Sequence, residues 1–214
     1  MDWYKRNQLE GAICETLGPG AAQARDLKLR IKRLLLTDRR LGRGKRSDHC
    51  QPSGYAFYSA KPQGSGNEVM FTGFEVFAVL AALLLLRHGV PQARAVSILR
   101  EVRPDLEAAH DEILKKDTKA LFDERGIRAM ASPGAIAVDS TAPIFLAFVE
   151  LEIGKGRVKA TISVCRGLDE LGKFLREHSV AGSGATFFQF TRLMHTLAGN
   201  LAKTRPIKRG RSSS

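Results

Sequence analysis

The sequence has few cysteines and no apolar run long enough to cross a bilayer. Cys14, Cys50 and Cys165 are odd in number and far apart, so they give no disulfide framework or metal-ligand spacing and favour a reducing compartment. The most apolar run, residues 76–86, falls well short of the roughly 20 residues that span a membrane. We expect this run to be a buried helix.

Acidic residues are also scarce relative to basic ones. The chain of 214 residues carries 34 Lys and Arg against 22 Asp and Glu, a formal net charge of +12. A surplus of this size indicates a polyanionic partner, either nucleic acid or an anionic membrane. Residues 1–10 contain no apolar signal segment, so we expect a cytoplasmic, nucleoid-associated protein.

Hydrophobic periodicity predicts a mostly helical first half. The expected helices cover residues 7–17, 26–41, 73–88, 91–102 and 105–116. The helix over 73–88 is apolar nearly all round, which places it in the centre of a core. The helix over 26–41 has one apolar stripe, which consists of Leu27, Ile31, Leu34, Leu35 and Leu41. Asp26 and Gly42 fit its two ends.

The polar remainder of the helix over 26–41 is nearly all cationic. One flank carries Lys28, Lys32 and Arg39, and the other carries Arg30, Arg33 and Arg40. Like charges three and four residues apart repel each other, a mild cost that phosphate groups would remove. The alternative interpretation is an ordinary solvated basic face.

A β-ribbon is predicted to follow this helix. Residues 55–59 and 68–72 have the composition of two short strands, and residues 61–67 form a flexible turn that carries Lys61. Two helices, a ribbon and two further helices are typical of a winged helix-turn-helix.

The order of these elements resembles the DNA-binding domain of MerR-type regulators over about the first 105 residues. The stretch Gly54-Tyr55-Ala56-Phe57-Tyr58 stands where that family has a wing strand, and residues 83–102 resemble its supporting helices. The turn over residues 18–25 is longer than the family's tight turn. The resemblance implies a recognition helix followed by a β-wing over 55–72.

On this interpretation the helix over 26–41 enters the major groove of DNA. The residues expected to face the duplex are Lys28, Arg30, Lys32, Arg33 and Thr37, of which the arginines are suited to guanine and the lysines to phosphate. Those expected to contact the phosphate backbone are Arg39, Arg40, Arg43, Lys45, Arg46 and Lys61. Lys5 and Arg6 are further candidates for phosphate contacts.

The second half changes period. Residues 143–153 and 157–165 are predicted strands joined by a turn at 154–156, and residues 134–138 are a candidate third strand. Helices are expected over 168–178 and 186–201. This half is predicted to be a small α+β unit that dimerises or binds an effector, and a plain stabilising extension is the alternative.

The expected fold class is therefore mainly α with an α+β C-terminal part. The predicted domains are a winged helix-turn-helix DNA-binding domain over 1–122, a strand-hairpin-plus-helices domain over 127–202 and a disordered basic tail over 203–214.

Catalytic interpretations have little support in the sequence. Asp48, His49 and Cys50 are adjacent, and adjacent residues seldom converge on one metal ion. Nothing local supports Cys165 with His178 or His195 as a nucleophile and base. No Gly-rich stretch has the lysine of a P-loop. We therefore expect no enzyme, no cofactor and no metal.

The function predicted from these features is a sequence-specific, double-stranded DNA-binding transcriptional regulator that acts as a homodimer and does not bind membranes. One alternative is a DNA-binding component of phage or plasmid machinery, such as a terminase small subunit or a recombination directionality factor. Another is an RNA-binding protein that uses the aromatic residues of 55–59.

Overall fold

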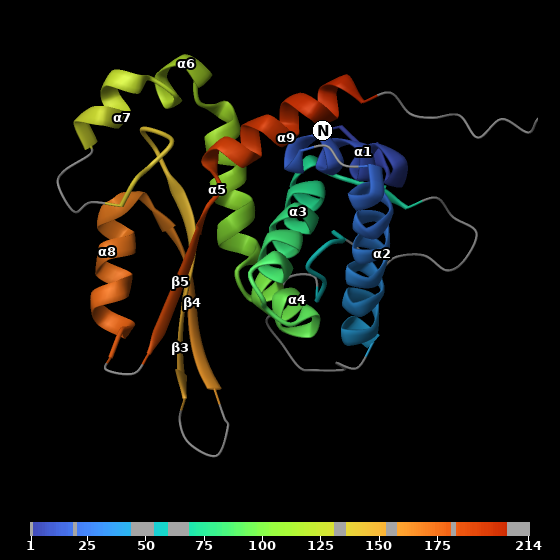
Figure 1. Ribbon diagram of the computed structural model, residues 1–214, viewed down its shortest axis with the longest axis horizontal. Coiled ribbons are helices and arrows are strands. Elements are labelled where there is room, and N and C mark those ends of the chain that lie inside the picture. The colour runs from blue at the N-terminus through green and yellow to red at the C-terminus, as the bar shows by residue number, and fades with distance from the viewer. Residues whose placement is uncertain are drawn as a thin grey trace, which may run out of the picture. The chain divides into compact units, whose positions relative to one another are not determined.

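The protein is mainly helical and contains a small three-stranded antiparallel sheet (Figure 1). The computed structural model describes residues 2–18, 21–43, 54–59, 69–130, 136–152, 158–180 and 183–204. Its contacts divide the chain into two compact units. The first consists of residues 1–101 and 196–214, and the second of residues 102–195. The domain boundary expected at 122–127 lies inside this second unit.

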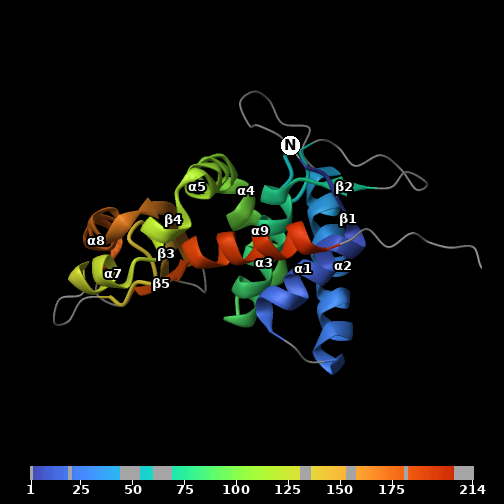
Figure 2. The ribbon, with the colours of Figure 1, turned by 90° about the horizontal axis from the view of Figure 1, so that it is seen from above.

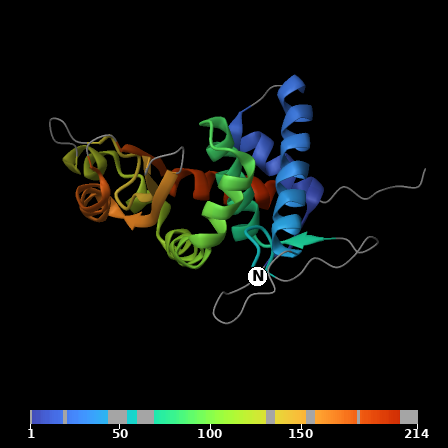
Figure 3. The same ribbon diagram turned by 90° about the horizontal axis from the view of Figure 1, so that it is seen from below.

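The first unit is built from helices. They are α1 (Arg6–Leu17), α2 (Ala21–Arg43), α3 (Gly73–Arg87), α4 (Gln92–Glu101) and the second half of α9 (Thr191–Lys203). The helices predicted in this region are confirmed. However, α2 begins five residues earlier than expected, so only residues 18–20 separate it from α1. Figure 3 shows α2 alongside α1 and α3.

The core of the first unit surrounds α3, as its composition predicted. Phe77, Leu80 and Leu85 are completely buried, and α3 contacts α1, α2 and α4. Thr72 caps the helix, because its hydroxyl accepts a hydrogen bond from the Glu75 N–H at 3.2 Å. The Glu75 carboxylate accepts one in return from the Thr72 N–H at 2.8 Å.

The predicted pairing of the β-wing is wrong. Residues 54–59 form no strand, and β2 (Met70–Phe71) pairs instead with β1 (Tyr4–Lys5) near the N-terminus. Ala56, Phe57 and Tyr58 are buried. Residues 61–67, with the predicted turn and Lys61, lie outside the described residues.

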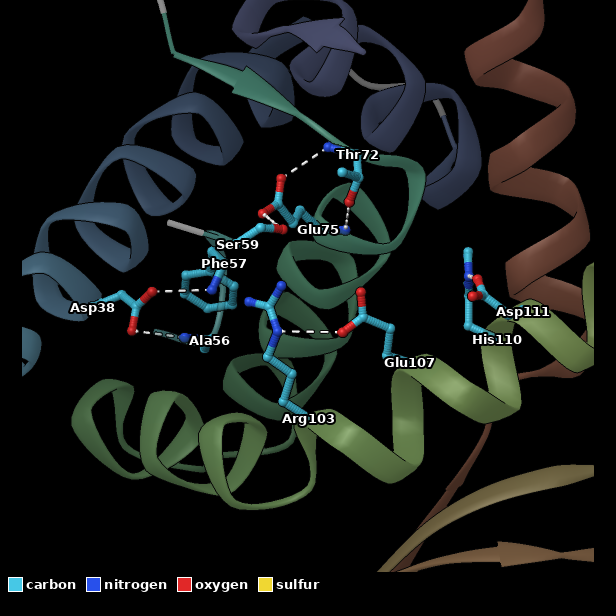
Figure 4. A network of polar contacts seen from close by, with 10 residues as sticks. All are labelled: Asp38, Ala56, Phe57, Ser59, Thr72, Glu75, Arg103, Glu107, His110 and Asp111. Carbon is cyan, nitrogen blue, oxygen red and sulfur yellow. Dashed lines mark hydrogen bonds and ion pairs between the residues drawn. The ribbon is translucent and has the colours of Figure 1, made fainter. Parts of the chain in front are cut away.

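Two buried carboxylates explain why residues 54–59 do not form a strand (Figure 4). Asp38 of α2 accepts hydrogen bonds from the Ala56 and Phe57 N–H groups, both at 3.0 Å. Glu75 of α3 accepts one from the Ser59 hydroxyl at 2.7 Å. Because its N–H groups bind a carboxylate, the segment crosses the helices as a strap instead of entering a ladder.

The second unit contains the α+β part. Its elements are α5 (Arg103–Lys115), α6 (Thr118–Leu121), α7 (Glu124–Met130), β3 (Ile144–Glu152), β4 (Val158–Arg166), α8 (Gly167–His178) and β5 (Gly184–Gln189). The strand order is β4-β3-β5, and both neighbours are antiparallel to β3. The predicted β3, β4 and α8 are confirmed. The residues of the turn expected at 154–156 lie outside the described part of the chain.

The third strand is β5, which the sequence assigned to the start of a helix. The candidate strand at 134–138 is not formed by its described residues 136–138. In β5 the side chains alternate: Phe188 stacks near Phe148 on one face, and Phe187 meets Phe145 edge-on on the other. Helix α8 covers the Phe145 face (Figure 2). Because its side chains alternate between the two faces of the sheet, the segment before Thr191 is a strand, and the helix begins only at Thr191.

No helix within the described ranges has the length and apolarity needed to cross a membrane. Helix α9 ends at Lys203, and most of the basic C-terminal stretch, residues 205–214, lies outside the described residues.

Candidate nucleic-acid interface

Helix α2 has one face in the core and one in solvent. Ile31, Leu34 and Leu35 are buried, as predicted, where α2 contacts α1, α3 and α4. Leu27 is half-buried, however, and Leu41 is exposed. Twenty-three residues give the helix a length of about 34 Å at a rise of ~1.5 Å per residue.

The solvent face of α2 presents the basic surface. We use this name for the exposed cationic side chains Arg25, Lys28, Arg30, Lys32, Arg33 and Arg40. All but Arg25 were predicted from the sequence. Arg25 was missed because residues 18–25 were interpreted as a turn, although three of residues 21–24 are alanine, the strongest helix former.

Most of the basic surface has no anionic partner in the described part of the chain. Within these residues, no carboxylate lies within ion-pairing distance of Lys28, Lys32, Arg33 or Arg40. The exception is Arg30, whose Nε lies 2.7 Å from Asp26 Oδ2. Both side chains of this i,i+4 pair are about half exposed, and such pairs contribute only about 0.3–0.5 kcal/mol. Solvent or a polyanion can therefore displace Asp26 at little cost.

Two predicted DNA contacts interact with the protein itself. The Thr37 hydroxyl accepts a hydrogen bond from Gln92 Nε2 of α4. The Arg39 guanidinium lies 5.3 Å from the centre of the Tyr58 ring. Burial raises the pKa of the Tyr58 hydroxyl, and the Arg39 charge opposes this shift. The side chains of Thr37 and Arg39 therefore help to hold α2 in place.

The remaining predicted contacts fall at or beyond the ends of the described segments. Arg43 ends α2, but its side chain is not described. Lys45 and Arg46 lie outside the described residues, as does Lys61. Of the two N-terminal candidates, Lys5 is half-buried, and Arg6 is exposed and pairs with Glu10 at 2.8 Å.

A buried ion pair fixes the orientation of α2. Asp38 is fully buried on the core face and lies 2.7 Å from Arg100 Nη2 of α4, and Arg100 Nε donates to the same carboxylate at 2.8 Å. Because its carboxylate also binds the strap at residues 56–57, Asp38 joins α2 to two other segments. The position of Asp38 on the apolar face of the helix was a signal in the sequence that this acid is buried. Nothing in the sequence indicated its partner Arg100, which lies 62 positions away.

Gly42 positions the same end of α2. The sequence indicated that this glycine ends the helix, but α2 continues to Arg43. A Cβ at Gly42 would overlap the ring of Tyr55. The glycine therefore allows the ring to lie directly on the helix, with the Arg100 guanidinium 5.9 Å from its centre.

The second unit contains a pocket that is lined by two of the residues considered in the sequence. Cys165 and His178, which the sequence raised as a nucleophile and base, both line a pocket of about 310 Å³ between β4 and α8. Burial raises the pKa of the Cys165 thiol, which disfavours the reactive thiolate. His195 contacts the Ile113 carbonyl oxygen at 3.1 Å instead.

Metal-ligating side chains do not cluster in the portion of the chain that the structure covers, where no group of three His, Cys, Asp or Glu residues is suitably placed. The sequence 48–50 lies outside that portion. Comparisons with protein-family models, with curated proteins and with solved structures find no match to this chain.

Proposed function

We propose that the protein is a sequence-specific, double-stranded DNA-binding transcriptional regulator and that α2 is its reading helix. One observation carries the proposal. The basic surface places six cations on a single helix, and the only described acid paired with it is the exposed Asp26. Charges left without internal partners are suited to the phosphates and base edges of a polyanion.

Exposed leucines within the basic surface support a role in reading bases. Leu29 is 48 % exposed and Leu36 is 40 % exposed, and both alternate with Arg33 and Arg40 along one line of α2. In the major groove, Arg binds guanine through two hydrogen bonds, and apolar side chains contact the methyl group of thymine.

The mode of docking rests on α1 and α2. Residues 18–20 are all that separates them, which is a shorter connection than the sequence indicated and is closer to the tight turn of a helix-turn-helix. We therefore propose the MerR-like mode of docking for α1 and α2 alone. This mode does not require the predicted β-wing.

Duplex DNA is favoured over RNA as the partner. The RNA interpretation relied on the aromatic rings of residues 55–59, but Phe57 and Tyr58 of this strap are buried. Single-stranded bases stack on exposed rings. The proposal accordingly assigns the protein to the cytoplasm, on the nucleoid, and treats RNA binding as an outcome that the experiment distinguishes.

We further propose a homodimer, because one helix-turn-helix reads few base pairs and dimers read two half-sites. Strand β4 supplies a candidate surface. It is an edge of the sheet that α5 contacts at the Arg166 end, where Arg166 pairs with Glu112 at 3.6 Å. Its central residues 160–165 carry no charge, whereas natural edge strands commonly carry charges that prevent pairing. A palindromic binding site would favour this dimer over packaging or recombination machinery.

The test begins with selection of bound duplexes from a random pool at physiological salt. The proposal predicts an enriched motif. Arg30→Ala/Arg33→Ala should then bind that motif several kcal/mol more weakly, because each missing base contact costs about 1–3 kcal/mol. Fluorescence anisotropy measures the affinity, and circular dichroism should be unchanged because both side chains are exposed.

A matched control removes two exposed cations elsewhere. Lys119→Ala/Arg125→Ala lowers the net charge equally but leaves α2 intact, so its affinity should stay close to that of the wild type. Equal losses in the two double variants would show a general charge effect. Enrichment without a motif would indicate an architectural or packaging protein, and efficient competition by single-stranded RNA would indicate an RNA-binding protein.

A further inference from the structure

A small pocket opens beside the N-terminal half of α2, where α1, α2 and α3 meet. Its volume is about 190 Å³. Leu17 of α1, Leu27 of α2 and Leu83 and Leu84 of α3 line it. The pocket is smaller than the roughly 300–1,000 Å³ typical for drug-sized ligands, so only a small molecule fits.

Two guanidinium groups also line the pocket. Arg30 comes from α2 and Arg87 from the last turn of α3. Among the described residues that line the pocket, Asp26 is the single carboxylate, and it is already paired with Arg30. Two cations against one anion leave a net positive charge beside an apolar wall. The complementary ligand therefore has a short apolar body and one anionic head.

Arg30 belongs to both the pocket and the basic surface. Its ion pair with Asp26 is half exposed and therefore weak, so its guanidinium can turn toward an anion in the pocket or toward DNA. It cannot bind both at once. A ligand that engages Arg30 in the pocket removes one contact from the reading helix, and by linkage DNA weakens the binding of the ligand to the same degree.

From these contacts we infer that the pocket is a regulatory site for a small amphipathic carboxylate, which antagonises binding of nucleic acid by α2. The regulatory part rests on the proposed function, whereas the binding site does not. The linear six-carbon series supplies matched probes: hexanoate has the anionic head, 1-hexanol lacks the charge, and hexylammonium has the opposite charge.

The first experiment titrates each probe into the full-length protein and follows backbone amide resonances by NMR. Hexanoate should give saturable shifts confined to residues 14–18, 26–30 and 83–87, and the other two probes should bind much more weakly. Equal affinity for hexanol and hexanoate would overturn the assignment to carboxylates. Shifts that do not saturate, or that lie elsewhere, would overturn the site.

A variant pair tests the role of the cation. Arg87→Gln removes a charge from the pocket, and Arg94→Gln removes one from α4, outside it. Removal of a charge-assisted hydrogen bond should weaken hexanoate binding about tenfold in Arg87→Gln. The affinity of Arg94→Gln should stay within about twofold of the wild type. Equal affinities in the two variants would contradict the role of Arg87.

The last experiment measures the linkage. Hexanoate, compared with the same concentration of chloride, should weaken binding of the selected duplex by the wild type. At the same hexanoate concentration the effect should be much smaller in Arg87→Gln, whose duplex affinity without hexanoate should match that of the wild type. Hexanoate binding with no effect on a duplex that the protein does bind would refute the regulation. A protein that binds hexanoate but no duplex would refute the proposed function and leave the pocket standing.

Discussion

The two faces of α2 differ in whether their charged side chains have partners within the protein. On the core face, Asp38 is fully buried and bonded to Arg100 and to two backbone N–H groups. On the solvent face, Arg33 and Arg40 have no acidic partner among the described residues. A buried charge must find partners within its own chain, whereas an exposed charge need not.

This difference separates residues that hold α2 from residues that can bind a partner. Thr37 and Arg39 occupy the boundary between the faces and interact with Gln92 and Tyr58, so they belong with the core face. Changes on the core face should therefore lower stability, and changes on the solvent face should lower affinity without loss of stability.

The largest effect is expected at Asp38. Asp38→Ala removes the carboxylate that pairs with Arg100 and that accepts from two backbone N–H groups, and breaking a buried ion pair in this way costs about 3–5 kcal/mol. Urea denaturation followed by circular dichroism gives the free energy of unfolding. Asp26→Ala, which breaks the exposed pair with Arg30, should cost less than ~0.5 kcal/mol. Equal costs would show that burial does not distinguish the two faces.

A smaller effect is expected at Gly42. Alanine is a better helix former than glycine by about 1 kcal/mol, but a Cβ here would overlap the ring of Tyr55. Overpacking costs roughly 1–3 kcal/mol, so after the gain in helix propensity Gly42→Ala should destabilise the protein by up to about 2 kcal/mol. The helical Gly199 has open space around its Cβ position, and Gly199→Ala should stabilise by up to about 1 kcal/mol. Thermal unfolding of the two variants should shift in opposite directions.

The second unit also contains a buried side chain that can carry a charge, His110. Burial lowers the pKa of this imidazole, and the nearby His195 adds to the effect, although Asp111 opposes it. Because the unfolded chain binds the proton more readily, stability should fall as the pH drops below about 6.5. The free energy of unfolding cannot change by more than about 1.4 kcal/mol per pH unit when one proton is bound. His110→Gln should flatten this dependence, and an unchanged slope would show that His110 is not its source.

Helices with regular apolar spacing were predictable from the sequence. The bounds of α3 and α8 came within about a residue, because a continuous apolar face decides each of them. The start of α2 was placed too late because glycine and proline at residues 18–20 were taken to begin a longer loop.

Features that depend on distant partners were not predictable. Residues 55–59 have strand composition, but Asp38 and Glu75 bind their polar groups, and neither acid is near them in sequence. For β5, the residues 186–190 fit both a strand and the start of a helix, and pairing with β3 decides between them. The exposed cations of α2 were predictable because the charge of a side chain, unlike its partner in the fold, follows from the local sequence.

The salt dependence of duplex binding tests the central claim most directly, because it counts the cations that contact phosphate. Lys28→Gln/Lys32→Gln should lower the slope of log K against log salt by about 1.8, because each phosphate that a cation neutralises contributes ~0.9. The charge-matched Lys119→Gln/Arg125→Gln should keep the slope of the wild type. A slope that is the same in all three proteins would contradict the assignment of α2 as the surface that binds DNA.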